Sequence, residues 1–221
     1  MRPQAWTGLV LTMATVGAIL VAGAPHAHSA VYVSELDPNG RFAHLAIANE
    51  ITAADATKFE KLVESLAAKI DVVDVELNSA GGDVAAAMRI GRIIRSRGLW
   101  TIAPDDAGTK CASACVLILA AGVVRIGGED SRVVIHRPYF QPALFASLAR
   151  DQAQQRYAQM TNLVRSYLSE MGMPEDLFKE MLKVPSDEGR VLSYAELQDL
   201  TLVGWDPAYQ EWLKAKGQSP H

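Results

Sequence analysis

Two residues of this chain combine the side-chain chemistry and the local setting of a nucleophile and its base. Ser113 precedes an apolar run, at an expected loop-to-helix junction where its hydroxyl and the next backbone N–H point the same way. His136 ends a short β-branched run, so it should lie at a strand end, where catalytic groups are often found. A serine hydroxyl is a weak nucleophile until a base takes its proton, so this pair could catalyse acyl transfer. Each residue also has a plainer interpretation, the serine as a helix N-cap and the histidine as a half-buried structural residue.

A glycine pair, Gly81 and Gly82, follows an expected strand and precedes an expected helix. Glycine lets a backbone approach a ligand closely, and the free N–H groups and dipole at a helix start favour developing negative charge. The pair could therefore supply part of an oxyanion hole, the set of N–H donors that binds a tetrahedral intermediate. A tight turn without a ligand is the commoner use of such a pair.

The only two cysteines, Cys111 and Cys115, stand two residues either side of Ser113. Residues four apart on a helix have Cα atoms near the upper end of the disulfide range, so a bridge is feasible in an oxidising compartment. The alternative is a pair of small buried thiols that pack beside a helix start. These cysteines form none of the usual spaced metal motifs with His44 and His136, so no metal site is expected.

The amino end differs in composition from the rest of the chain. Arg2 precedes an uncharged apolar stretch over 7–24, and small residues follow up to Ala30, which is typical of a secretory signal. The sequence therefore predicts a signal peptide over 1–30, one domain over 31–221, and a periplasmic or secreted location. The apolar stretch is at the lower edge of a spanning length, so an uncleaved membrane anchor stays the alternative.

Strand and helix patterns alternate over the first two thirds of the chain. This order predicts an α/β domain with a largely parallel sheet and covering helices. The expected strands are 41–48, 72–77 (followed by a loop over 78–82), 99–103, 123–126 and 133–135. The expected helices are one capped by Thr52, then 84–97 closed by Gly98, 113–121, a long stretch over 143–171, one opened by Pro174, and one with a capping box of Ser193 and Glu196.

Three segments occur in the order and approximate spacing found in the Clp-type proteolytic subunit, and together they make the chain resemble that family. They are 77–82, 111–114 with 119–122, and 131–138. The resemblance covers 72–138 well and the helical remainder more loosely. It implies an α/β fold of the ClpP/crotonase type, built from repeated β-β-α units, here with a long carboxyl-terminal helical region. It also implies a nucleophile, a general base and two backbone N–H donors of an oxyanion hole, which are Ser113, His136, Gly82 and Ala114 respectively.

The chain departs from the family pattern at the third member of the triad, the carboxylate that orients the histidine. The position that matches the family aspartate is Gly189. Asp187 is the preferred substitute for this role and Glu188 the alternative, one or two residues earlier. Lys110 suggests a serine–lysine variant, as in signal-peptide peptidases of the same fold, but its spacing from the serine does not match theirs.

The segment after Pro138 also departs from the pattern. The glycine-rich strand that lines the substrate groove and joins rings in the family is replaced by 139–144. Ring assembly is therefore not assumed. A long helix from Ala143 could make a homo-oligomer, or it could pack on its own domain as an amphipathic surface helix.

Together these features predict an exported serine-type endopeptidase that hydrolyses peptide bonds through an acyl-enzyme, with no cofactor. A peptide or an unfolded protein is the expected substrate, and a membrane is a partner only if the amino-terminal segment stays uncleaved. The formal net charge of −4 provides no broad basic surface, so nucleic acid is not an expected partner. The alternatives are a ClpP-fold binding or assembly module that has lost the triad, and crotonase-type acyl-coenzyme A chemistry, for which an exported enzyme would lack its cofactor supply.

Overall fold

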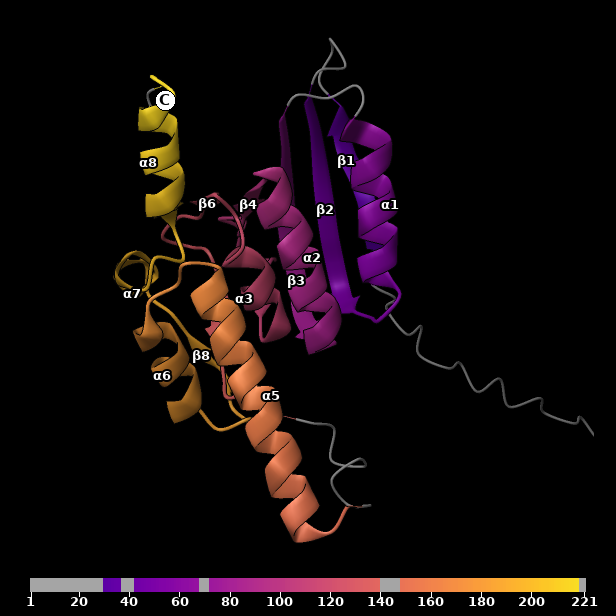
Figure 1. Cartoon of the computed structure of the whole chain (residues 1–221), viewed down its shortest axis with the longest axis vertical. Coiled ribbons are helices and arrows are strands. Elements are labelled where there is room, and N and C mark those ends of the chain that lie inside the picture. Colours follow the sequence, from indigo (N-terminus) through magenta and orange to yellow (C-terminus); the bar gives the residue numbers. More distant parts are fainter. Residues whose placement is uncertain (1–29, 37–41, 68–71, 140–147, 219–221) are drawn as a thin grey trace, which may run out of the picture.

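The sheet is the part of the fold that positions the candidate residues, and Figure 1 shows it with helices packed against it. The computed structural model describes residues 30–36, 42–67, 72–139 and 148–218. The strands are β1 Ala30–Leu36, β2 Phe42–Ile51, β3 Val72–Gly82, β4 Trp100–Ile102, β5 Cys111–Ala112, β6 Val124–Ile126, β7 Val133–Ile135, β8 Arg190–Val191 and β9 Gly204–Trp205. Paired strands from β2 to β7 run parallel, and β1, β8 and β9 join antiparallel to single neighbours. The prediction of a largely parallel sheet is confirmed.

Strand β3 connects the two parts of the sheet. It pairs with β2 from one end to the other, while β4 lies beside its first half and β5 beside its second half. On the far side of β5, β7 pairs with β5 and β8 pairs with β7. Parallel neighbours end at the same edge of a sheet, so the carboxyl ends of β3, β5 and β7 meet there. Because β8 runs the other way, its first residue lies at that same edge.

The glycine pair belongs to this central strand, which corrects the sequence-based expectation of a loop over 78–82. Gly81 and Gly82 pair with Glu50 and Ile51 of β2 after a shift in register. The neighbouring strand thus extends β3 through residues that would form a turn on their own, because tertiary pairing overrides local turn preference.

The helices are α1 Asp55–Ala67, α2 Val84–Arg97, α3 Ala114–Leu119, α5 Arg150–Glu170, α6 Glu175–Lys183, α7 Tyr194–Asp199 and α8 Pro207–Ala215. The bounds of α2 match the prediction, because the Asp83 carboxylate accepts from Ala86 N at 2.7 Å and Gly98 ends the helix with φ of 64°. The capping box of Ser193 and Glu196 is also present.

Two predicted helix starts were wrong or incomplete. Helix α1 begins at Asp55, and Thr52 donates its backbone N–H and hydroxyl to the Asp55 carboxylate instead of capping the helix. Helix α5 begins at Arg150, with residues 148 and 149 outside it, so it is shorter than the predicted 143–171. The remainder of that prediction, over 143–147, lies outside the described residues.

Helix α5 is anchored to the core at its carboxyl end. All six residues of α3 are buried, and the Tyr167 hydroxyl of α5 donates to the Leu117 carbonyl of α3 at 2.8 Å. The tyrosine crosses α2 at Gly91, where an added Cβ would lie 1.8 Å from its hydroxyl oxygen. A side chain at residue 91 would therefore push α5 away from α2 and α3.

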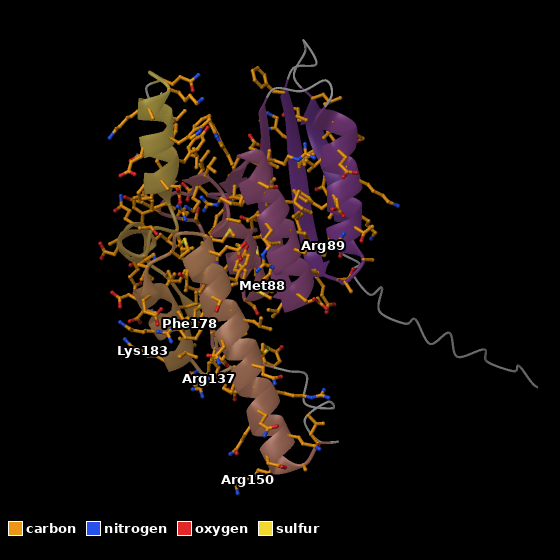
Figure 2. The ribbon with its side chains drawn as sticks, in the orientation of Figure 1. Met88, Arg89, Arg137, Arg150, Phe178 and Lys183 are labelled. Atoms are coloured by element: carbon orange, nitrogen blue, oxygen red, sulfur yellow. A yellow bond between two sulfur atoms is a disulfide. The ribbon has the colours of Figure 1, made fainter. Side chains whose placement is uncertain are left out.

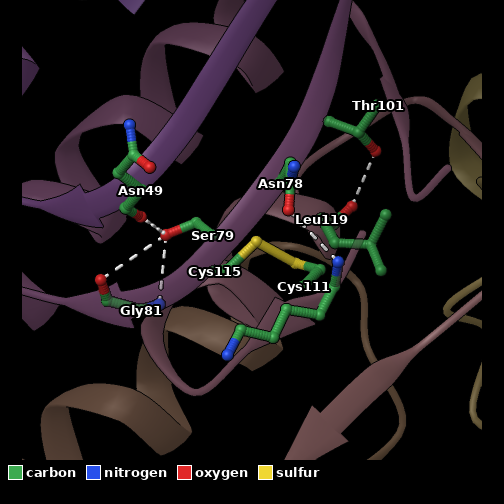
Figure 3. The surroundings of a disulfide bond; sticks show 9 residues. Asn49, Asn78, Ser79, Gly81, Thr101, Cys111, Cys115 and Leu119 are labelled. Carbon is green, nitrogen blue, oxygen red and sulfur yellow. Dashed lines mark hydrogen bonds between the residues drawn. A yellow bond between two sulfur atoms is a disulfide. The ribbon is translucent and has the colours of Figure 1, made fainter. Parts of the chain in front are cut away.

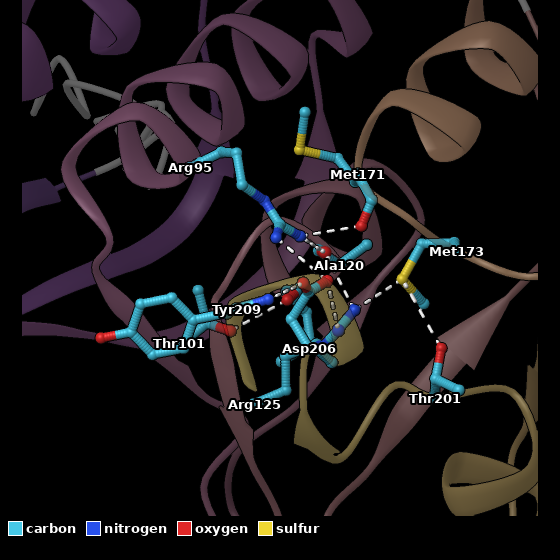
Figure 4. Close-up of polar contacts among 10 residues, drawn as sticks. Arg95, Thr101, Ala120, Arg125, Met171, Met173, Thr201, Asp206 and Tyr209 are labelled. Carbon is cyan, nitrogen blue, oxygen red and sulfur yellow. Dashed lines mark hydrogen bonds and ion pairs between the residues drawn. The ribbon is translucent and has the colours of Figure 1, made fainter. Parts of the chain in front are cut away.

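A buried charge cluster ties the carboxyl-terminal segment to the core (Figure 4). The Asp206 carboxylate pairs with Arg95 Nη1 at 3.0 Å and Arg125 Nη2 at 3.3 Å, and it caps α8 by accepting from Tyr209 N. The Arg125 side chain is fully buried, and this burial lowers its pKa to about 10. Removing one partner of such a group leaves a buried charge uncompensated, so the cluster holds α8 to α2 and β6.

The predicted signal peptide over 1–30 lies outside the described residues except for Ala30, the first residue of β1. Within the described part of the chain, no helix has both the length and the apolar character needed to span a membrane. Export and the domain boundary at residue 31 stay predictions.

Candidate active site

A cleft of about 1250 Å³ lies at the carboxyl edge of β3, β5 and β7. It is lined by Ser113, His136, Gly82 and Ala114, so the structure brings four of the predicted site residues to one place. The order of the strands explains this grouping, because each residue lies at or just after the end of its own strand. Asp187, the predicted third member, does not line the cleft.

Ser113 occupies a strained turn between β5 and α3. Its φ of 57° and ψ of −122° place a non-glycine residue in a backbone region that typically costs about 1–3 kcal/mol. The turn is held by Ser113 N, which donates to Val134 O of β7 at 3.0 Å. The Ser113 side chain makes no capping hydrogen bond, so it does not serve as the N-cap that the sequence also allowed. A sharp strand-to-helix turn can expose a serine hydroxyl, and Ser113 lines the cleft.

The glycine pair packs directly against the serine turn. Gly81 has φ of 99°, and an added Cβ there would lie 2.7 Å from Ser113 Cβ and 2.8 Å from Ala112 O. Gly82 has φ of 143°, and its added Cβ would lie 2.1 Å from Ile51 O. Both positions therefore require glycine, for conformation and for space. The N–H of Ala114, the first residue of α3, has no partner within the helix, as at any helix start.

A disulfide braces the same turn (Figure 3). Cys111 of β5 is bonded to Cys115 of α3, with the Cα atoms 5.2 Å apart and both residues buried. The bond joins the last strand residues before Ser113 to the first helical turn after it. Beside it, Ser79 of β3 accepts from Gly81 N at 3.1 Å and donates to Asn49 O. The serine turn is thus held from the strand, the helix and the glycine pair.

His136 follows β7, and its ring is oriented by its own neighbour in the chain. Its Nδ1 bonds with the Arg137 carbonyl oxygen at 2.8 Å, and its ring contacts that of Tyr139 at 5.5 Å between centroids. Because a carbonyl oxygen only accepts, Nδ1 must carry the proton and Nε2 keeps its lone pair in the neutral ring. Ser113 and His136 share the cleft without a hydrogen bond between them in this structure.

The loop before β8 does not bring a carboxylate to the imidazole. Asp187 and Glu188 are both exposed, and neither side chain makes a hydrogen bond or an ion pair with another described residue. Lys110 is also exposed and does not line the cleft. Position 189, by contrast, is one residue beyond Arg190 at the end of the antiparallel β7–β8 ladder where Ile135 pairs with Arg190, and His136 is one residue beyond Ile135 at that same end.

Comparison with protein-family models finds the Clp protease family, whose model matches residues 40–196. The chain belongs to the Clp protease family. No curated protein sequence matches it.

Two solved structures of proteases resemble the family fold seen here. A ClpP1 mutant from Listeria monocytogenes is 21% identical with a TM-score of 0.56, and the match covers 72% of this chain and 88% of that one. A mutant of the 1510-N membrane-bound stomatin-specific protease is 17% identical with a TM-score of 0.51, covering 72% of this chain and 75% of that one. At these identities the likeness shows the fold alone, and it agrees with the ClpP/crotonase type that the motifs implied.

In this member of the Clp protease family, the apolar wall of the cleft comes from α2 and α3, which follow the glycine pair and Ser113, and from α5 and α6, which sequence reasoning did not bring to the site. Five buried residues form it, Met88 of α2 (labelled in Figure 2), Leu117 of α3, Met160 and Val164 of α5, and Met181 of α6. Arg156 and Gln159 of α5 add polar groups at the same cleft. The sequence left open whether α5 packs on its own domain as an amphipathic helix or makes an oligomer, and no local signal placed it at the cleft.

The described residues contain no group of three or more histidine, cysteine or acidic side chains placed to hold a metal ion.

Proposed function

We propose that the protein is an exported serine peptidase that cleaves peptide bonds with Ser113 as nucleophile and His136 as general base. The observation that carries the proposal is the Ser113 turn, which has a positive φ, is held by glycine contacts and a disulfide, and lines the same cleft as His136. Such strain at a non-glycine residue clusters at functional sites and is not needed for a simple helix start.

The proposed reaction proceeds in two steps. His136 Nε2 takes the hydroxyl proton as Ser113 Oγ bonds to the substrate carbonyl carbon, and the proton then passes to the departing amine as the peptide bond breaks. Water cleaves the resulting ester with the same base, which returns the proton to Ser113 Oγ. The N–H groups of Gly82 and Ala114 bind the oxyanion in both steps. Asp187 stays a sequence-based prediction for the group that orients the histidine.

The substrate that we propose is a peptide or an unfolded protein, because the cleft combines an apolar wall with polar groups, as apolar side chains and the peptide backbone require. Export through the amino-terminal segment is part of the proposal, and amino-terminal sequencing of the native protein should begin near Val31. An intact Met1 on the native protein would contradict it. A homo-oligomer formed through α5 is proposed with it, and the mass of the native protein in solution tests that part.

The deciding experiment is covalent labelling of the full exported protein with a fluorophosphonate, which reacts with activated serine hydroxyls. The expected result is one label per chain, lost in Ser113→Ala and kept in Ser166→Ala, a matched change of an exposed serine on α5. An unlabelled wild type with intact fold would contradict the peptidase proposal.

A binding module of the same fold is the second candidate function. Gly189 at the position of the family aspartate favours it, as does Asp187, whose side chain bonds to no other described residue, because a histidine without an orienting carboxylate is a weaker base. Failure of the labelling experiment would make this the better account.

A further inference from the structure

We propose that the main-chain carbonyl of Arg137 takes the place of the third, orienting member of the triad, so that the site works as a serine–histidine pair with a backbone orienter. The inference rests on the proposed peptidase function and names a positioning group for that same site. The alternative is a triad that Asp187 or Glu188 completes.

The first observation is the hydrogen bond of the imidazole itself. His136 Nδ1 lies 2.8 Å from Arg137 O, within the range of a well-formed N–H···O bond. An orienting carboxylate acts at this same ring nitrogen, where it selects the tautomer and aims Nε2 at the nucleophile. Since the carbonyl already accepts the Nδ1 proton, it selects the tautomer and restrains the ring without a carboxylate.

The second observation is that the Arg137 backbone is held in place at two points. Arg137 N and Nε donate to the Val184 carbonyl, at 2.9 and 3.1 Å, just after α6 ends. Pro138 follows and is buried, and a residue that precedes proline is confined to extended backbone. The direction of the Arg137 carbonyl is therefore set by α6 and by the proline, as an orienting group requires.

The third observation is the position of Gly189, next to the last pair of the β7–β8 ladder, Ile135 and Arg190. An added Cβ at residue 189 would lie 2.9 Å from Val134 Cγ1. Val134 and position 136 are two residues apart along the strand direction, so they share one face of the sheet. A side chain at residue 189 would thus stand on the face that carries the imidazole, and the glycine leaves that place without a carboxylate.

The loop before β8 is also restrained from supplying its own carboxylates. Arg190, next to the glycine, donates Nη2 to Glu180 of α6 at 2.9 Å and Nη1 to Glu196 of α7. Moving Asp187 or Glu188 onto the imidazole would require a shift of this anchored strand. The loop carboxylates accordingly stay in solvent.

A neutral carbonyl does less than a carboxylate, because it stabilises the imidazolium formed during the reaction less strongly. The other charged and titratable groups described at the cleft offer no replacement: Tyr139 contacts the imidazole through its ring, and Glu50, Asp83 and Arg156 line the cleft without bonding to it. The expected consequence is a peptidase with a slow acylation step that a carboxylate at residue 189 would accelerate.

The experiment measures fluorophosphonate labelling rates of the full protein across pH for wild type, Gly189→Asp and Gly189→Asn. Aspartate should raise the rate about tenfold and move the midpoint of the pH–rate curve upward, because its charge stabilises the imidazolium. Asparagine matches it in size, meets the same Val134 contact, and should change the rate by less than about twofold. Equal rates for the two substitutions would overturn the proposal.

Substitutions of the loop carboxylates test the alternative, in which Asp187 or Glu188 orients the histidine. Asp187→Asn and Glu188→Gln should each leave the labelling rate within about twofold of wild type, whereas a tenfold loss in either would name that residue as the third member. A readout independent of activity is the ¹⁵N NMR spectrum of the histidines, in which neutral His136 should be the Nδ1–H tautomer. The Nε2–H tautomer would overturn the backbone-orienter proposal. If no variant were labelled but His136 were the Nδ1–H tautomer, the proposed peptidase function would fail. The hydrogen bond from His136 to the Arg137 carbonyl would still be supported.

Discussion

Ser113 is held from several directions, whereas His136 is held mainly by the residue that follows it. The serine turn has a disulfide across it, a glycine contact beneath it and a strand bond from its N–H to Val134 O. The imidazole has a single hydrogen bond, to Arg137 O, and a ring contact with Tyr139. The two sides of one candidate site thus differ greatly in how much structure supports them.

The difference arises because Ser113 and His136 need different things from the surrounding structure. A hydroxyl on a positive-φ turn and an oxyanion donor nearby need close backbone packing, which only particular residues permit. An orienter needs one acceptor at the correct ring nitrogen, and a main-chain carbonyl can provide it. The serine turn should therefore tolerate few substitutions. The orienting group, by contrast, can be replaced by another hydrogen-bond acceptor, and the reaction then proceeds at a lower rate.

The largest effect on labelling is expected from His136→Ala. Loss of the base should lower the labelling rate of Ser113 by about 10²–10⁴-fold, because the hydroxyl then keeps its proton near neutral pH. His44→Ala is the matched control, since that half-exposed histidine pairs with Asp74 at 2.8 Å and does not line the cleft. If the labelling rate were unchanged in His136→Ala and fell in His44→Ala, then His44 and not His136 would be the base.

Gly81→Ala should have the next largest effect. The new methyl group would overlap the Ser113 turn, so the labelling rate should fall about 100-fold, comparable with loss of an oxyanion donor. Gly98→Ala is the control, because Gly98 also has a positive φ but its added Cβ meets no atom within 4 Å. It should reduce stability by about 1 kcal/mol and leave labelling unchanged, as measured by denaturant unfolding and labelling kinetics. Equal losses of labelling would show that backbone strain, and not contact with Ser113, decides the effect.

Replacing both cysteines, in Cys111→Ser/Cys115→Ser, should have a smaller effect on labelling. The bond braces a turn that the glycine contact and strand bond also hold, so a several-fold decrease is expected, with a stability loss of about 2 kcal/mol. Mass spectrometry of the non-reduced wild type should show two hydrogens fewer than the reduced form. Two freely alkylatable thiols in the exported protein would contradict the bond, and a labelling rate unchanged by the double substitution would show that it does not support the turn.

Asp206→Asn should have the smallest effect on labelling and a large one on stability. It leaves buried Arg125 and partly buried Arg95 without their shared carboxylate, which should lower the unfolding free energy by about 3 kcal/mol. The cluster does not line the cleft of Ser113, so labelling of the folded protein should stay within about twofold of wild type. Chemical denaturation measures the free energy of unfolding, and the labelling rate is measured at a temperature where the variant is folded. A loss of labelling in parallel with the loss of stability would show that the charge cluster also supports the site.

Local patterns were sufficient for much of the molecule. Helix α2 was predicted with its bounds because Asp83 and Gly98 act within a few residues of the ends that they set. The capping box at Ser193 was found for the same reason. The family was evident from three motifs, and these motifs also identified Ser113 and His136, which the structure places in one cleft.

The sequence by itself determined which groups can do chemistry, because side-chain identity and short-range spacing are written along the chain. Only the tertiary structure decided how they meet. The two-residue strands β5 and β8 form because neighbours distant in sequence pair with them, and β3 continues through Gly82 because β2 lies alongside. The bond from His136 to Arg137 O depends on Val184, 47 residues from Arg137, so no local pattern could indicate it. Contacts of this separation form only when the whole sheet closes, since the chain entropy of each loop must be offset by the packing of all the others.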